Sequence, residues 1–208
     1  MKKMILSMLF AALTPAFCDV PAECTPAPRG AWWPNYFKAM MQREPRDTDL
    51  VFLGDSITMM WRSQSGFEGG TAVWNKYYKP LNACNYGVSG DKTENILWRL
   101  GEGKNMDGFN PRVCVLLIGI NNLLQGSTPQ NTAAGITAIV RELRKNHPDM
   151  KILLLGVFPC RPKPEDPIRQ KVKDTNAAIA GLHDGKHIFY ADIGSVFLEK
   201  DGTVSKEI

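Results

Sequence analysis

A serine directly follows a short apolar run in the motif Gly54-Asp55-Ser56-Ile57-Thr58. If the run is a strand and a helix begins after it, the Ser56 hydroxyl projects over the sheet edge while its own N–H points at an incoming oxyanion. Such a serine could attack a carbonyl carbon as a nucleophile. A helix N-cap, which Ser and Asp supply routinely, is the alternative, and the motif by itself favours the cap.

Two further apolar runs end in groups that could donate hydrogen bonds into a cleft. The segment Asn85-Tyr86-Gly87-Val88-Ser89-Gly90-Asp91 has two glycines, which permit tight turning and close approach of the backbone to a ligand. Gly119-Ile120-Asn121-Asn122 adds a side-chain amide. Taken alone, a glycine-rich turn explains the first segment equally well, and a turn or capping asparagine is favoured for the second.

The elements that must position these groups alternate along the chain, since short apolar runs ending in Gly or a polar turn are followed by helix-like segments. This alternation predicts a parallel sheet with helices on both faces. The predicted strands are 50–53, 83–86, 113–118, 152–157 and 188–191. The predicted helices are 92–100, 132–145 and 168–182, from apolar residues at helical spacing.

Sites in open parallel sheets form at the carboxyl ends of the strands. In the usual doubly wound order, Ser56, Gly90 and Asn121 would therefore converge on one crevice. A nucleophile and three donors would then surround one point. The three segments together predict an acyl-transfer site.

These blocks, written Gly54-Asp55-Ser56, Gly87-x-Ser89-Gly90-Asp91 and Gly119-x-Asn121-Asn122, resemble the SGNH/GDSL hydrolases in order and approximate spacing. Closer still, Trp98-Arg99-Leu100, the Asn-Asn pair and the run from Leu153 to Pro159 are similar to one branch of that family. That branch contains the platelet-activating-factor acetylhydrolase catalytic subunits and many bacterial secreted esterases.

The resemblance implies an α/β, flavodoxin-like three-layer sandwich with a five-stranded parallel sheet over residues 32–208. It implies a carboxylic-ester hydrolase with Ser56 as nucleophile and with the oxyanion held by the Ser56 N–H, the Gly90 N–H and the Asn121 side-chain amide. No metal or organic cofactor is implied. The expected substrate is a short acyl ester, such as an acetyl ester, of a small molecule or carbohydrate. Trp61, Tyr77 and Tyr78 could line a sugar-binding cleft, although aromatics at such spacing are more often core.

The family's general base lies in an Asp-x-x-His block after the last strand, and this sequence ends at Ile208, where that block would begin. We therefore expect a domain that is incomplete at its C-terminus and lacks its last helix, with a catalytically impaired, ligand-binding fragment as the alternative function. Asp184-Gly185-Lys186-His187 matches the block formally. However, it precedes a predicted strand and so belongs at the amino end of the sheet, as does His147. We expect these histidines and His183 to lie at the protein surface or to have structural roles.

The N-terminus has the layout of a secretory signal over residues 1–18, with Met1-Lys2-Lys3, an apolar stretch and small residues before Asp19. A secreted or periplasmic protein follows, with a buried N-terminal helix as the alternative. The apolar stretch is too short to predict a membrane span. The length predicts one domain, and the net charge of +4 is scattered rather than clustered into the basic stripe of a nucleic-acid binder.

Cleavage of the signal would leave an even number of cysteines, Cys24, Cys84, Cys114 and Cys160, in an oxidising compartment where disulfides can persist. The sequence leaves their pairing open. Cys114 lies inside an apolar run and is expected to be a small buried hydrophobe. No two cysteines have metal-ligand spacing, which argues against a zinc site.

Overall fold

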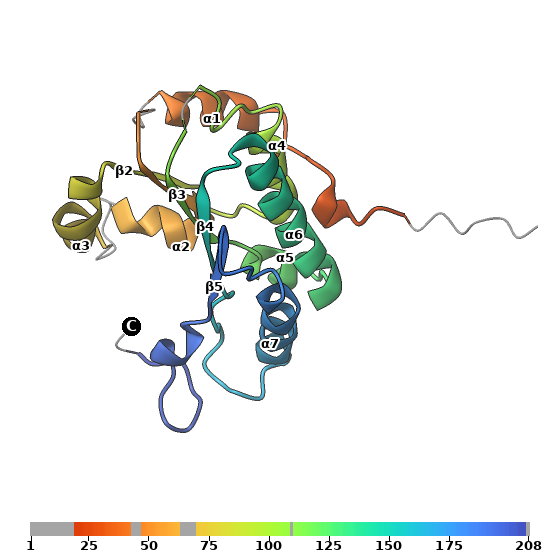
Figure 1. Cartoon of the computed structure of the whole chain (residues 1–208). Helices are drawn as coiled ribbons and strands as arrows, with labels where there is room; N and C mark the ends of the chain where they lie inside the picture. The colour runs from red at the N-terminus through yellow and green to blue at the C-terminus, as the bar shows by residue number, and fades with distance from the viewer. Residues whose placement is uncertain (1–18, 43–46, 63–69, 109, 207–208) are drawn as a thin grey trace, which may run out of the picture.

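The computed structural model describes residues 19–42, 47–62, 70–108 and 110–206, so the predicted signal segment lies outside the described residues. Its centre is a five-stranded sheet in the order β2-β1-β3-β4-β5, and every neighbouring pair is parallel (Figure 1). The strands are β1 (Leu50–Gly54), β2 (Ala83–Gly87), β3 (Val113–Leu117), β4 (Lys151–Leu155) and β5 (Ile188–Ala191). This order is that of the flavodoxin-like, doubly wound sheets, and the predicted fold class is confirmed.

Helices lie on both sides of the sheet, as Figure 1 shows, with α4, α6 and α7 on one side and α2 and α3 on the other. The helices are α1 (Trp33–Met41), α2 (Ser56–Met59), α3 (Thr71–Val73), α4 (Thr93–Leu100), α5 (Ile120–Leu124), α6 (Pro129–Asn146) and α7 (Pro167–Ala180). Single turns add 3₁₀ segments at Ala22–Cys24, Met60–Arg62, Lys79–Leu81 and Gly194–Phe197, and a π-helical turn at Trp74–Tyr78. In the described part of the chain, no helix is long and apolar enough to cross a bilayer.

The main core lies between the sheet and the layer of α4, α6 and α7. Because successive side chains of a strand point to opposite faces, every second strand residue enters this core. These buried strand residues are Val51, Leu53, Cys84, Tyr86, Cys114, Leu116, Ile152 and Leu154. On the opposite face, the ring of Phe52 packs against Trp74 and Tyr78 with centroid separations of 5.1 and 4.9 Å. Cys114 is fully buried, as predicted.

At two of the element bounds that differ from the predicted ones, a backbone N–H group donates to a side-chain oxygen. The chain leaves the sheet after β4 because the Val157 N–H donates to Asn176 Oδ1 at 2.8 Å. The long helix α6 begins at Pro129, three residues earlier than predicted, because the Thr128 side chain caps it by accepting from the Asn131 N–H. The start of α6 follows from known capping chemistry, in which Thr precedes a Pro at the first helical position.

Candidate active site

The three strand exits singled out in the sequence lie on neighbouring strands. Gly54, the last residue of β1, is in register with Gly87 on β2 and with Leu117 on β3. The chain turns out of all three strands just beyond this line, so Ser56, Gly90 and Asn121 follow at the same edge of the sheet. Gly87 is required here, since a Cβ at this position would lie 2.7 Å from the Thr58 carbonyl carbon of α2.

Ser56 is the first residue of α2 and is half-buried. The residue that caps the helix is Asp55, whose Oδ1 accepts from the Ile57 N–H at 3.0 Å. Ser56 therefore does not serve as the cap that its motif favoured when taken alone. Its N–H is one of the first amides of the helix, which have no carbonyl partner within the helix itself.

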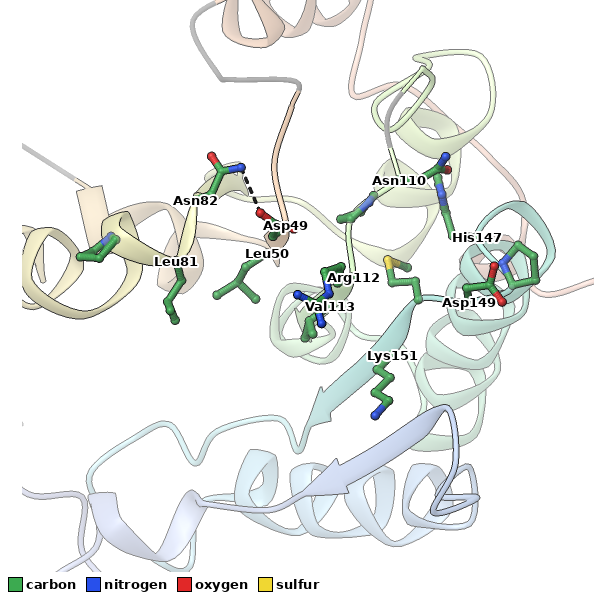
Figure 2. Close-up of a pocket in the computed structure, with 14 residues that line it drawn as sticks. Asp49, Leu50, Leu81, Asn82, Asn110, Arg112, Val113, His147, Asp149 and Lys151 are labelled. Carbon is green, nitrogen blue, oxygen red and sulfur yellow. Dashed lines mark hydrogen bonds between the residues drawn. The ribbon is translucent and has the colours of Figure 1, made fainter.

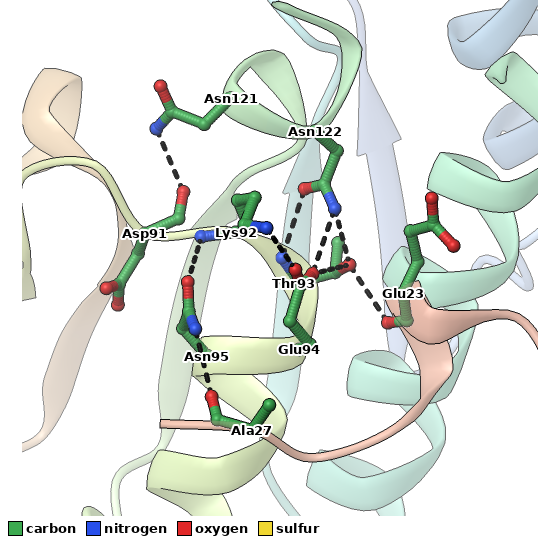
Figure 3. A network of polar contacts seen from close by, with 9 residues as sticks. All are labelled: Glu23, Ala27, Asp91, Lys92, Thr93, Glu94, Asn95, Asn121 and Asn122. Carbon is green, nitrogen blue, oxygen red and sulfur yellow. Dashed lines mark hydrogen bonds and ion pairs between the residues drawn. The ribbon is translucent and has the colours of Figure 1, made fainter. Parts of the chain in front are cut away.

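The second and third exits are joined by a direct hydrogen bond. Asn121 Nδ2 donates to the Asp91 carbonyl at 2.9 Å, which fixes the side chain across the turn that contains Gly90 (Figure 3). A carboxamide carries two N–H donors, so the second can serve a ligand. Gly90 itself has a φ of +76°, a conformation that favours glycine. The structure thus brings two of the predicted donors together.

Asn122 has a role that the sequence reasoning missed. Its side chain is buried, its Oδ1 accepts from the Thr93 N–H at 3.1 Å, and its Nδ2 donates to Glu94 Oε2 at 3.0 Å (Figure 3). These bonds tie the start of α5 to the start of α4. Asn121 is the neighbour of Asn122 in α5, and Asp91 lies two residues before the start of α4. By joining the two helix starts, Asn122 therefore holds the Asn121–Asp91 hydrogen bond in place.

A buried ion pair lies directly behind the same turn. Arg99 Nη1 is 3.1 Å from Asp91 Oδ2, both side chains are fully buried, and Arg99 Nη2 donates to the Tyr86 carbonyl at 2.8 Å. Burial raises the pKa of Asp91 to about 6, although Arg99 acts in the opposite direction, and burial lowers the pKa of Arg99. An arginine inside the apolar helix pattern of Trp98-Arg99-Leu100 is the signal that could have revealed this pair.

Asp55 is the second buried carboxyl at this edge. Burial raises its pKa from 3.8 to about 6, against the hydrogen bond from the Ile57 N–H, which lowers it. The charge of Asp55 also raises the pKa of Asp91. The Asp55 carboxylate therefore opposes the ionisation of Asp91 beside the candidate site.

The raised pKa of Asp55 predicts a pH dependence of stability. Between about pH 4 and pH 6 the folded state binds more protons than the unfolded state, so the free energy of unfolding falls as pH rises and levels off above that window. Asp55→Asn, which keeps a capping oxygen, should make this fall shallower in urea titrations. Asp166→Asn is the matched control, because Asp166 caps α7 with the same 3.0 Å bond. An unchanged slope in Asp55→Asn would contradict the prediction.

The histidines lie at the other edge of the sheet. His147 precedes β4 and lines an open hollow of about 1010 Å³ at the amino ends of the strands, with Asp49, Arg112 and Lys151 (Figure 2). In the formal Asp-x-x-His match, Asp184 Oδ1 accepts the backbone N–H groups of the turn into β5, which lowers the pKa of Asp184 to about 2. A five-residue strand spans about 16 Å, so these side chains are remote from Ser56, as the parallel sheet predicts.

Other predicted features have mixed outcomes. The ring of Tyr78 packs against that of Trp61, with a centroid separation of 5.7 Å, and also against the rings of Phe52 and Trp74. The side chain of Tyr77 is 54% exposed. Cys24, Cys114 and Cys160 are free thiols in this structure, and Cys84 is buried. Over the described ranges, no group of three or more His, Cys, Asp or Glu side chains could hold a metal ion.

The parallel α/β sandwich belongs to the three-layer α/β class, and its serine, glycine turn and asparagine amide at one sheet edge are groups suited to acyl transfer. Comparison with known proteins narrows the class. The chain belongs to the GDSL-like lipase/acylhydrolase family, whose model matches residues 52–207.

Individual relatives agree with this assignment. Platelet-activating factor acetylhydrolase IB subunit alpha1 of Homo sapiens is 31% identical over 180 residues, which are 85% of this chain and 72% of that protein. A putative acylhydrolase from Bacteroides fragilis superposes with a TM-score of 0.64 at 19% identity, over 84% of this chain and 85% of its own. A catalytic variant of an acetylxylan esterase from Geobacillus stearothermophilus gives 0.54 at 19%, over 75% and 86%. The predicted family and branch are confirmed, and the structural neighbours support the fold.

Proposed function

We propose that the protein is a serine esterase that hydrolyses short-chain carboxylic esters, such as acetyl esters of small molecules or carbohydrates. One observation carries the proposal: Ser56 begins α2 at the sheet edge where the Asn121 amide is bound to the Asp91 carbonyl beside Gly90. A nucleophile flanked by preorganised donors is the arrangement that acyl transfer requires.

In the proposed reaction, Ser56 Oγ attacks the ester carbonyl carbon and gives its proton to a general base. The oxyanion of the tetrahedral intermediate accepts hydrogen bonds from the N–H groups of Ser56 and Gly90 and from Asn121 Nδ2. Collapse of the intermediate expels the alcohol, which takes the proton from the base. Water then hydrolyses the acyl-enzyme through the same steps. The base is assigned to none of the three histidines, because they lie at the amino edge of the sheet.

The substrate class is supported by the names of the relatives and by two aromatic side chains. Both an acetylhydrolase subunit and an acetylxylan esterase are similar to this chain, which favours a small acyl group. Half-buried Trp61 lies in the 3₁₀ turn Met60–Arg62 after α2, and exposed Tyr77 lies in the π-helical turn Trp74–Tyr78. Aromatic faces of this kind can stack on a sugar ring. The basic and apolar layout of residues 1–18 supports export from the cytoplasm.

A fluorophosphonate reagent tests the proposal, because it phosphonylates only an activated serine. We expect intact-protein and peptide mass spectrometry to find a single adduct, on Ser56, in the protein made from its complete gene. Ser56→Ala should give no adduct under the same conditions, because the reagent reacts with the serine hydroxyl. Labelling at another serine, or no labelling of the folded protein, would contradict the proposal.

A further inference from the structure

The N-terminal segment places an arginine on the turn that carries the predicted oxyanion donor. The Arg29 guanidinium donates through Nη1 to the Ser89 carbonyl. Its Nη2 and Cζ atoms lie 2.9 and 3.1 Å from the point where a Cβ on Gly90 would stand. Arg29 therefore covers the Ser89–Gly90 peptide from the outside, and it belongs to a part of the chain that precedes the family match at residues 52–207.

The Ser89 carbonyl and the Gly90 N–H belong to one peptide unit. Because a trans peptide is planar, its C=O and N–H point in opposite directions. A donor that holds the carbonyl on one side consequently fixes the N–H on the other. Gly90 has a φ of +76°, and glycine has little steric resistance to rotation of its peptide planes, so this peptide needs an external restraint.

Although Arg29 is exposed, neighbouring groups hold it in place. Its Cζ atom lies 5.7 and 5.3 Å from the ring centroids of Trp32 and Trp33. The segment before it is bound to α4, because the Ala27 N–H donates to the Glu94 carbonyl at 3.0 Å and Asn95 Nδ2 donates to the Ala27 carbonyl at 2.9 Å. Cation–π contacts and a fixed backbone reduce the entropy that a lone surface arginine would lose.

We infer that Arg29 is a positioning residue of the oxyanion hole: its hydrogen bond to the Ser89 carbonyl orients the Gly90 N–H toward the ester oxygen. A charged donor on the carbonyl also polarises the peptide, which makes the Gly90 N–H a stronger donor. Arg29 acts through Gly90 and need not touch the substrate. The inference rests on the proposed function, because it concerns a donor to the proposed oxyanion.

Arg29→Ala in the protein from the complete gene is expected to lower kcat for an aryl acetate by about tenfold to a hundredfold, less than the outright loss of a donor. KM should change little, because the restraint acts on the transition state. Added guanidinium ion should restore part of the kcat of Arg29→Ala, and Arg29→Lys should keep part of it. Arg112→Ala is the control, since it removes the same charge from an exposed arginine at the amino edge.

A second measurement, the NMR resonance of the Gly90 amide, does not depend on enzymatic activity. Serine–glycine pairs occur in the sequence only at 65–66 and 89–90, so labelling serine with carbonyl ¹³C and glycine with ¹⁵N isolates two amide resonances. Arg29→Ala should move the Gly90 resonance, and guanidinium should move it back. An unchanged Gly90 resonance and an unchanged kcat would overturn the inference. An inactive wild-type protein whose Gly90 resonance still responds would instead refute the proposed esterase.

Discussion

Ser56→Ala is expected to lower kcat for an aryl acetate by about 10⁶-fold, the size of the loss when the nucleophile of a serine protease is removed. The reason is that no acyl-enzyme can form without the Ser56 hydroxyl, and only the oxyanion donors remain to assist water. The fold should be unaffected, because the cap of α2 is Asp55 and not Ser56. The measurement is steady-state hydrolysis by the protein from the complete gene, together with a thermal melt.

Ser195→Ala is the matched control for this substitution. Ser195 is an exposed serine in the 3₁₀ turn Gly194–Phe197, so its loss removes the same hydroxyl from outside the three segments that form the candidate site. We expect its kcat to equal that of the wild type. Turnover by Ser56→Ala within tenfold of the wild-type value would show that another group performs the attack, and would remove Ser56 from the proposed mechanism.

The largest effect on stability is expected at Arg99. Arg99→Met should lower the free energy of unfolding by about 3–5 kcal/mol, because it leaves the Asp91 carboxylate buried without its partner. The Tyr86 carbonyl also loses the donor at 2.8 Å, and the ring of Phe37 loses a cation 5.5 Å from its centroid. Urea titrations at pH 8 measure the loss.

The pH dependence of that loss distinguishes charge burial from packing. Arg99 lowers the pKa of Asp91, so its removal raises that pKa above about 6, and protonation relieves the buried charge as pH falls. The destabilisation by Arg99→Met should therefore be smaller at pH 5 than at pH 8. Pairing it with Asp91→Asn should recover part of the stability. Arg112→Met is the control, and a loss that is equal at both pH values would contradict the account.

The sequence by itself determined the fold class and the candidate segments. Short apolar runs that alternate with helix-like segments are typical of a parallel sheet between two layers of helices. The five predicted strands are all present in the structure. Ser56, Gly90 and Asn121 could be selected because strand exits in such sheets meet at one edge. The rejection of His147 and His187 followed from the same topology, since both precede strands.

Only the tertiary structure decided which group caps α2, how the donors are held and what supports them. Asp and Ser are both common N-cap residues, so the sequence could not decide between Asp55 and Ser56. The backbone geometry of the folded chain makes Asp55 the cap. The bonds from Arg29 to Ser89 and from Asn121 to Asp91 join segments far apart in the chain, and the pair of Arg99 with Asp91 connects α4 to the turn before it. Local periodicity carries no information about such contacts, because a hydrogen bond depends on distances and angles that arise only when the packed layers bring the segments together.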